Sequence, residues 1–215
     1  MTGVQTCALP IFDKTLYAYN FRYRLPELAR LTGSSQYHLA STWWAGGYEA
    51  RAEAGEWQSA ADYLDAFAHV TGTRLLSLEE WASARRLAMT VIPGSIAALR
   101  RAAELGTVSL LSNNPAATAT AMPQLAPEAC RIFDGNLLFS YQLRSRKPGA
   151  EIYRRALEHY GVDARDTFFA DDSAENVAGA RAVGITAHQL VAIDGEYQTE
   201  ALSAAIEAFA SRRTR

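Results

Sequence analysis

The sequence contains few cysteines, little net charge and no long apolar run. Its two cysteines, Cys7 and Cys130, cannot form a disulfide framework and favour a reducing compartment, the cytoplasm. A formal net charge of −2 gives no sign of nucleic-acid or membrane binding. No apolar run approaches the length of a membrane span, and the four histidines show no metal-ligand spacing. What remains is the composition of a globular protein, with 49% hydrophobic and 20% charged residues.

The most informative segment is a short apolar run, 168–170, that ends in two adjacent carboxylates, Asp171 and Asp172. Such a run is typical of a buried strand in a parallel sheet. Ligands of open α/β sheets lie beyond the carboxyl ends of the strands, so both side chains would point into a site. Adjacent anions repel each other unless a cation lies close, and Mg²⁺ is the usual cation for oxygen ligands. Helix N-capping by Asp172 and Ser173 would explain one carboxylate but not both.

Three other apolar runs stop abruptly at polar residues, namely Asp13, Ser112 and Ser140. Segments with helical spacing, at 148–160 and 174–183, alternate with the strand-like runs. This alternation predicts βαβ units with right-handed crossovers. The expected fold class is therefore α/β, with a doubly wound parallel sheet covered by helices on both faces.

The polar residues at the expected strand ends and loop starts are, in chain order, Asp13, Ser112, Lys147, Asp171 and Asp172. Strands ending at positions 12, 111, 139 and 170 would bring them together at one edge of the sheet. A hydroxyl or amide, such as Ser112 or Asn113, can hold a phosphate oxygen. Lys147 can neutralise charge around a transferring group, and carboxylates can hold a metal ion or transfer protons. The combination in this order indicates phosphoryl transfer.

These segments resemble the motifs of the haloacid dehalogenase-like (HAD) hydrolase superfamily, in the subgroup with a helical cap after the first strand. The matching segments are 12–16, 110–113, 146–148 with 152–153, and 169–177. The resemblance covers about 200 residues, too many for a chance motif match. It implies a Rossmann-like core, and it is strongest to phosphatases of sugar phosphates and related small metabolites.

The resemblance also implies a mechanism and a set of residues. The first family motif is Asp-x-Asp-x-Thr, in which the first Asp forms an aspartyl-phosphate and the second acts as acid and base. Asp13 falls on the second Asp, and its backbone carbonyl would join the carboxylates of Asp171 and Asp172 around Mg²⁺. Ser112, Asn113 and Lys147 would bind the phosphoryl group of a small phosphorylated metabolite.

One departure from the family pattern bears directly on activity. The nucleophile position is occupied by Ile11, which has no nucleophilic atom. Lys14 stands where the family usually has Gly, a milder change. The chain as written is therefore expected to bind phosphate with little or no turnover.

Residues 2–11 look like the translation of a sequencing-library adapter, which would mean that the native first strand and its nucleophile have been replaced. Pro10 fits this hypothesis, because proline removes a hydrogen bond from a central strand. A natural pseudoenzyme with a divergent first strand is the alternative. A signal peptide is a third interpretation, but the segment has no basic region and its apolar part is too short. Residues 1–11 are therefore expected to be an artefactual tail that contributes no functional residue.

Residues 18–90 contain no strand-like run and are typical of consecutive amphipathic helices. Ser77 and Glu80 have the spacing of a helix capping box. The segment would form an α-helical cap inserted in a core of residues 12–17 and 91–215. Such a cap would close over the site and exclude water. Candidate substrate contacts in it are Trp43, Trp44, Tyr48 and Glu49, although aromatic residues at helical spacing more often pack in a core.

Three function classes stay open. The first is a Mg²⁺-dependent phosphomonoesterase, and the second is a metal-free dehalogenase that shares the aspartate nucleophile but attacks carbon. Asp171 and Asp172 favour the first, because a metal-free site would not tolerate two clustered carboxylates. The third is a non-catalytic phosphate-binding protein, which Ile11 would allow.

Overall fold

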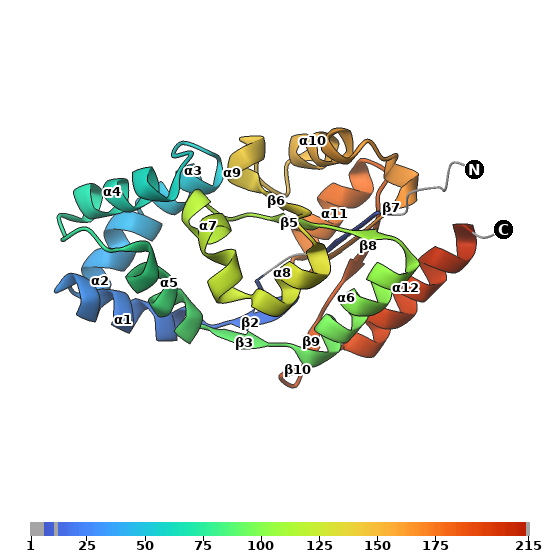
Figure 1. Cartoon of the computed structure of the whole chain (residues 1–215), viewed down its shortest axis with the longest axis horizontal. Helices are drawn as coiled ribbons and strands as arrows, with labels where there is room; N and C mark the ends of the chain where they lie inside the picture. Colours follow the sequence, from blue (N-terminus) through green and yellow to red (C-terminus); the bar gives the residue numbers. More distant parts are fainter. Residues whose placement is uncertain (1–6, 11–12, 214–215) are drawn as a thin grey trace.

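The structure, a computed structural model, describes residues 7–10 and 13–213. Figure 1 shows two lobes, one built from helices α1–α5 and the other from a strand layer flanked by helices. The strands β2 and β3 run side by side between the two lobes.

The central layer is a parallel sheet. Its strands have the order β4 (Thr107–Val108), β1 (Cys7–Pro10), β7 (Thr167–Asp171) and β8 (Thr186–Gln189). β5 (Leu110–Ser112) follows β4 after one residue and pairs in parallel with β6 (Leu137–Phe139). β4 and β5 are thus two pieces of one chain segment. The layer therefore has the order β6, β5 with β4, β1, β7 and β8, and β1 is its middle strand. Strands are added to both sides of β1, which is the doubly wound arrangement that the sequence predicts.

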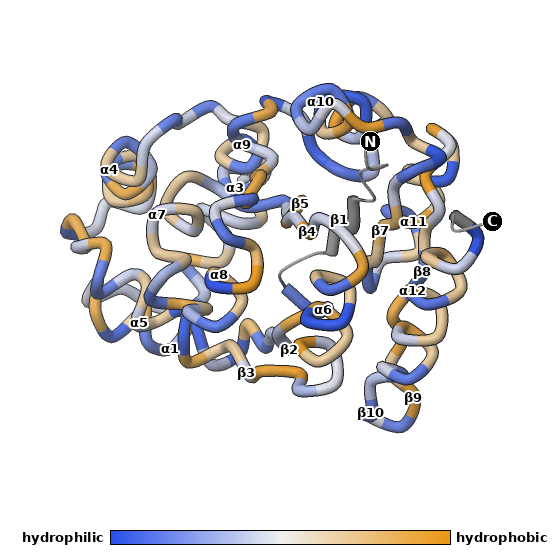
Figure 2. The backbone as a smooth tube through the Cα atoms, turned by 45° about the vertical axis from the view of Figure 1, so that its right-hand side comes forward, coloured by the Kyte–Doolittle hydropathy of each residue, from blue (hydrophilic) through white to orange (hydrophobic). Residues whose placement is uncertain are grey.

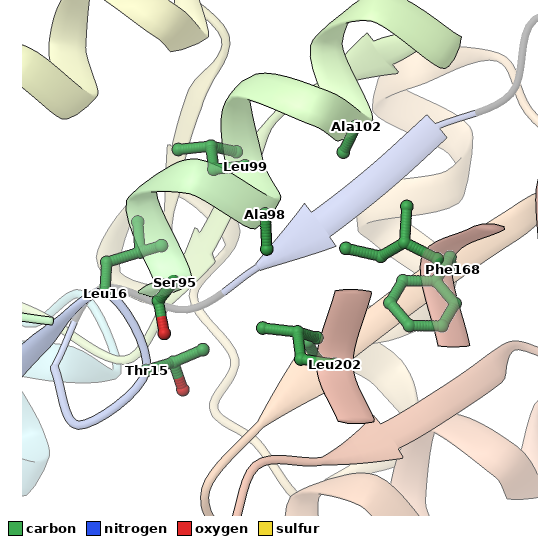
Figure 3. A pocket seen from close by; sticks show the side chains of 10 residues that line it. Thr15, Leu16, Ser95, Ala98, Leu99, Ala102, Phe168 and Leu202 are labelled. Carbon is green, nitrogen blue, oxygen red and sulfur yellow. The ribbon is translucent and has the colours of Figure 1, made fainter. Parts of the chain in front are cut away.

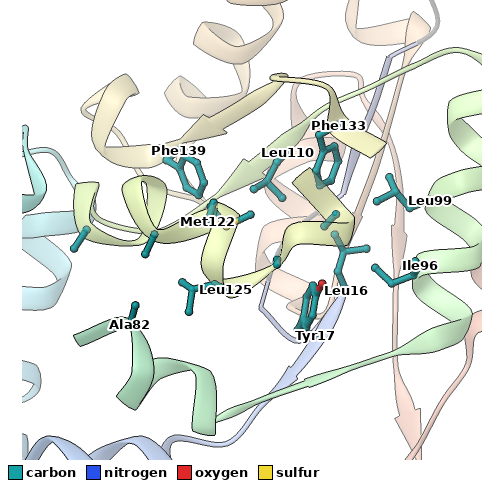
Figure 4. Close-up of a cluster of buried hydrophobic side chains, with 14 of the residues drawn as sticks. Leu16, Tyr17, Ala82, Ile96, Leu99, Leu110, Met122, Leu125, Phe133 and Phe139 are labelled. Carbon is teal, nitrogen blue, oxygen red and sulfur yellow. The ribbon is translucent and has the colours of Figure 1, made fainter. Parts of the chain in front are cut away.

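Both faces of the sheet are apolar. Phe168 and Ala170 of β7 belong to one buried cluster, whereas Phe169 between them belongs to a second cluster. Leu110 and Leu111 of β5 divide between the clusters in the same way. Side chains alternate across a strand, so a continuous apolar run supplies both faces at once. Figure 4 shows the first cluster, where Leu110 lies close to Phe139, Met122 and Phe133.

Helices cover the two faces. The first cluster contains residues of α6 (Pro93–Leu105), α7 (Ala116–Leu125), α8 (Pro127–Phe133) and α12 (Thr199–Arg213). The second contains residues of α10 (Ala150–Tyr160) and α11 (Ala174–Ala182). The remaining elements of this lobe are short: α9 (Ser140–Leu143), the 3₁₀ helix η2 (Ala164–Asp166), and the strands β9 (Ala192–Ile193) and β10 (Glu196–Tyr197) of a hairpin.

The helical lobe contributes aromatic residues to the first buried cluster, which therefore extends through both lobes. The helical lobe consists of α1 (Phe21–Thr32), α2 (Gln36–Leu39), the π-helix η1 (Ala40–Trp44), α3 (Tyr48–Glu53), α4 (Ala60–Thr71) and α5 (Leu78–Leu87). Trp43 is fully buried, with its ring 5.1 Å from that of Phe67 and 5.4 Å from that of Tyr63. The capping box at the start of α5 is confirmed: Glu80 N donates to Ser77 Oγ, and Ser77 N donates to Glu80 Oε2. We call the segment 18–90 the cap, and its boundaries stay a prediction.

The expectation that 18–90 contains no strand is wrong at both ends. β2 (Tyr17–Tyr19) and β3 (Met89–Val91) pair antiparallel, with Tyr17 opposite Val91 and Tyr19 opposite Met89. The two chain segments that connect the lobes lie side by side, and their backbone groups satisfy each other. Strands of three residues are too short to show an alternating sequence pattern.

Residues 7–10, which fall in the suspected tail, form the central strand β1. Its register pairs Pro10 with Ala170 of β7, whereas its pairing with β4 ends at Ala8. Pro10 is therefore the last residue of the strand, beyond the ladder on one side. The origin of residues 1–11 stays a prediction, and Ile11 and Phe12 lie outside the described residues.

Hydrophobic and hydrophilic residues are interspersed along the helices, as Figure 2 shows. Among the described residues, no helix is both long enough and apolar enough to cross a membrane.

Candidate active site

The expected site residues come together at the carboxyl ends of the strands. Ser112 is the last residue of β5, Asp171 is the last residue of β7, and Asp13 follows β1. Lys147 lies in the turn between α9 and α10, with its ammonium 3.4 Å from Asp171 Oδ2. β5 and β7 each extend one residue further than predicted, so Ser112 and Asp171 belong to the strands themselves. β6 ends at Phe139 as predicted, and the predicted strand end at position 12 lies outside the described residues.

Lys147 is buried and hydrogen-bonded through its side chain and its backbone. Its side chain is almost fully buried, and Nζ donates to the carbonyl of Leu111 at 2.7 Å. The side chain of Asn113 accepts from Lys147 N and donates to Lys147 O, both at 3.0 Å. Burial lowers the pKa of Lys147, while the charges of Asp171 and, more weakly, Asp172 and Glu53 oppose that shift. Asn113 thus positions the lysine with one N–H of its amide, and its predicted contact with phosphate stays a prediction.

The two adjacent carboxylates have different surroundings. Asp171 is fully buried; its Oδ1 accepts from Ser173 N at 2.8 Å, and its Oδ2 accepts no hydrogen bond and faces Lys147. Asp172 is partly exposed, and burial together with the charge of Asp171 raises its pKa. The N-cap of α11 is Ser173, whose Oγ accepts from Asn176 N. Helix capping therefore leaves both carboxylates unexplained.

Asn114, which sequence reasoning did not single out, connects the site. Its Nδ2 donates to Ser112 Oγ at 2.9 Å and to Asp13 Oδ2 at 3.1 Å. Its Oδ1 accepts from Arg85 and from Thr118. Its position directly after Asn113 was the available signal, but its partners come from distant parts of the chain.

Two charged residues of the cap, Arg85 and Glu53, also reach the site and were not predicted. Arg85 Nη2 donates to Asp13 Oδ2 at 2.6 Å. Glu53 pairs with Arg146, the neighbour of Lys147, at 2.6 Å. Burial, Glu49 and Asp13 raise the pKa of Glu53 to about 7 against the effect of Arg146. The cap is thus ion-paired to the other lobe through both Arg85 and Glu53.

The predicted substrate contacts in the cap pack against other cap residues, and their contact with substrate stays a prediction. Glu49 accepts hydrogen bonds from Trp43 Nε1 at 2.5 Å and Tyr63 Oη at 2.8 Å. Tyr48 stacks on Trp43, and Trp44 packs edge-on against Phe21. The contacts described for all four candidates are to other cap residues, so they build the cap core.

Lys14 has a φ of +60°. Residues with a side chain rarely adopt this left-handed conformation, whereas glycine adopts it freely. The backbone geometry accounts for the glycine usual at this position of the motif. The charge of Lys14 lowers the pKa of Asp172, in opposition to Asp171.

A small cavity lies between α6, α12 and β7 (Figure 3). Its volume is about 20 Å³, enough for a single water molecule but not for a metabolite. The hydroxyl groups of Thr15 and Ser95 at its wall are buried and have no hydrogen-bond partner. The cavity is otherwise apolar and is distinct from the cluster of charged residues.

The donor set fits a hard cation such as Mg²⁺. Asp13 Oδ1 and Asp171 Oδ2 are buried oxygen atoms that accept no hydrogen bond. Across residues 13–213, no group of three His, Cys, Asp or Glu side chains is arranged to hold a metal ion. An ion would therefore depend on Asp171, Asp172, backbone oxygens and water, which is how Mg²⁺ is commonly bound.

The site thus combines Ser112 and Asp171 at the ends of parallel strands with the buried Lys147 beside Asp171, next to a helical lobe. The sequence model of the haloacid dehalogenase-like hydrolases matches residues 12–184, so the chain belongs to this family.

Solved structures share the fold. A HAD family enzyme from Bacteroides thetaiotaomicron, in complex with magnesium and inorganic phosphate, is 20% identical, with a TM-score of 0.72 over 88% of this chain and 96% of that chain. An aspartate-to-alanine variant of that enzyme, also in complex with magnesium and inorganic phosphate, has a TM-score of 0.69 at 19% identity over 88% and 95%. The L-2-haloacid dehalogenase of Xanthobacter autotrophicus, with chloropropionic acid covalently bound, has a TM-score of 0.60 at 16% identity over 89% and 80%.

Proposed function

We propose that this fold serves Mg²⁺-dependent hydrolysis of a small phosphorylated metabolite, in the cytoplasm, through an aspartyl-phosphate. The observation that carries the proposal is the buried ammonium of Lys147 beside Asp171, with Ser112, Asn114 and Asp13 connected to the same strand ends. A fixed cation next to hydrogen-bonding groups is what a transferring phosphoryl group requires. The magnesium and phosphate complexes of the Bacteroides enzyme support this assignment.

Each residue of the site has its own role in this proposal. Lys147 neutralises charge on the phosphoryl oxygens, and Ser112 donates its hydroxyl to one of them. Asp13 exchanges a proton with the leaving-group oxygen. Mg²⁺, held by Asp171, Asp172 and the carbonyl of Asp13, would add charge neutralisation when bound.

We expect the chain as written to bind phosphate without turnover, because Ile11 offers no nucleophile. The aspartate-to-alanine variant of the Bacteroides enzyme is in complex with magnesium and phosphate, which supports binding in this fold after an aspartate is lost. Asp13 cannot take over, since reactive geometry does not tolerate a displacement of two residues along the chain.

The test is an Ile11→Asp variant assayed with small phosphomonoesters in Mg²⁺. We expect hydrolysis to appear in this variant and to be absent in the isosteric Ile11→Asn control. Robust Mg²⁺-dependent hydrolysis by the unaltered chain, abolished by Asp13→Asn, would show that Asp13 is itself the nucleophile.

The dehalogenase alternative predicts a different product. The Ile11→Asp variant would then release chloride from 2-chloropropionate in the presence of a metal chelator. The clustered charges of Asp171 and Asp172 argue against this outcome. If neither reaction appears and phosphate still binds, a non-catalytic phosphate-binding role is favoured.

A further inference from the structure

The cavity between α6, α12 and β7 has two hydroxyl groups in an otherwise apolar wall. They belong to Thr15 and Ser95, which are 0% and 1% exposed. Neither hydroxyl has a hydrogen-bond partner among the residues that the structure describes. Both side chains lie at the same end of the cavity in Figure 3. A buried hydroxyl without a partner costs free energy, and native proteins almost always supply one from the protein or from ordered water.

The size and the wall of the cavity determine what can fill it. Its volume of about 20 Å³ exceeds the roughly 10–15 Å³ that one water molecule needs, and it is too small for a phosphate group. The rest of the wall consists of side chains such as Leu99, Phe168 and Leu202, which offer no charge to an ion. Each of the two hydroxyls can donate or accept a hydrogen bond. A single neutral molecule that also donates and accepts, namely water, fits these conditions.

We propose that this cavity is a binding site for one structural water molecule, which bridges the hydroxyl groups of Thr15 and Ser95. The inference does not depend on the proposed function. Thr15 lies two residues after Asp13, in a turn that is closed by a hydrogen bond from Lys14 N to Tyr17 O at 2.6 Å. Ser95 lies in the first turn of α6. The water therefore holds the turn that carries Asp13 against this helix.

The first test is a crystal structure of the unaltered chain at a resolution that shows ordered water. We expect a density peak at about 2.7–2.8 Å from both hydroxyl oxygens. The double variant Thr15→Val with Ser95→Ala removes both hydroxyls with little change in side-chain size. It should lose the peak, because small apolar cavities stay dry. Absence of the peak in the unaltered chain, or a direct hydrogen bond between the two hydroxyls, would overturn the proposal.

A double-mutant cycle measures the same bridge in solution. Each single substitution, Thr15→Val or Ser95→Ala, removes one partner of the water and leaves the other hydroxyl buried. We expect each to raise the equilibrium constant of unfolding about tenfold. The double variant should raise it by less than the product of the two effects, because no unpaired hydroxyl then remains.

The matched control is Thr167→Val. Thr167 is also fully buried, but its hydroxyl donates to the carbonyl of Asp163 at 3.0 Å. Combined with Ser95→Ala, this substitution should give the product of the two single effects, since the two side chains have no described contact. A simple product for Thr15→Val with Ser95→Ala as well would overturn the bridge.

The anchoring of the turn has its own measurement. The amide of Lys14 donates to Tyr17 O, so its hydrogen exchange, followed by NMR, measures opening of the turn. We expect Ser95→Ala to accelerate this exchange several-fold, the size of effect of one lost hydrogen bond. Thr167→Val should leave it unchanged. Equal acceleration in both variants would overturn the anchoring of the turn through Ser95.

Discussion

At the scale of single residues, Glu53 is the carboxyl group whose protonation the fold changes most clearly in the cap. It lies between Arg146 and two further carboxylates, Glu49 and Asp13, and its pKa is raised to about 7, first by burial. An ordinary glutamate titrates near pH 4.3. Between these two values the folded protein binds more protons at Glu53 than the unfolded chain does, so this group's contribution to stability falls as pH rises through that window.

This linkage predicts the behaviour of a Glu53→Gln variant. Above pH 7 the native protein holds a largely buried ionised carboxylate at position 53, whereas the variant holds a neutral amide. We expect the Tm of the variant, relative to the native chain, to be higher at pH 8 than at pH 5. Calorimetric or circular-dichroism melting at both values measures it. The exposed Glu56, paired with Arg51 at 2.5 Å, provides a Glu56→Gln control that should show no such trend, and a pH-independent difference for Glu53→Gln would contradict the assignment.

At the scale of elements, the helix α5 has its N-cap at one end and a residue of the candidate site at the other. Its first turn is capped by Ser77, and its last turn carries Arg85. The helix has only ten residues, too short to be stable by itself, so its ends and its packing on α7 determine whether it forms. The N-cap at one end of α5 thus supports the contact between Arg85 and Asp13 at the other end.

Replacing Ser77 with alanine removes the hydroxyl that accepts from Glu80 N. We expect the free energy of unfolding to fall by about 1 kcal/mol, the usual cost of a lost N-cap. Ser83, inside the same helix, bonds only to the carbonyl of Glu80 among the contacts described. Ser83→Ala should therefore change stability by roughly 0.5 kcal/mol or less. Urea denaturation of both variants measures the two changes in the free energy of unfolding. Equal losses of stability would show that the Ser77 N-cap does not stabilise α5.

At the scale of the whole molecule, the candidate site lies where the two lobes meet. Arg85 and Glu53 come from the cap, and their partners Asp13 and Arg146 come from outside it. A ligand bound at the strand ends would bind the folded protein and not the unfolded chain, so its binding energy would add to the stability of the folded protein.

Magnesium should therefore raise the Tm of the chain, and Asp172→Asn should remove most of that rise. At a concentration about 100 times the dissociation constant, one bound ion adds roughly 2.7 kcal/mol. The control is the variant Asp163→Asn. Asp163 is an exposed carboxylate that pairs with Arg165 and lies before the first residue of β7, at the end of the strand away from the site. This variant should keep the full Mg²⁺ effect. An unchanged Mg²⁺ effect in Asp172→Asn would exclude this residue as a ligand.

Sequence reasoning predicted the parts of the fold that local chemistry controls. The apolar run before Asp171 became β7, buried on both faces, and the Ser77 and Glu80 spacing became a capping box. β2 and β3 were missed, because three-residue strands show no periodicity and exist through their pairing with each other. The four cap candidates were chosen by residue type, and the structure uses them to build the cap core.

The sequence by itself determined the α/β class, the order of the chemical groups along the chain and the identity of the strand-end residues. These follow from hydrophobic periodicity and side-chain chemistry, which act over a few residues. Only the tertiary structure decided that Arg85 meets Asp13, 72 residues away, and that Glu53 meets Arg146, 93 residues away. No local pattern encodes such pairs, because they form only when the cap packs on the other lobe and brings the charged side chains of the two lobes together.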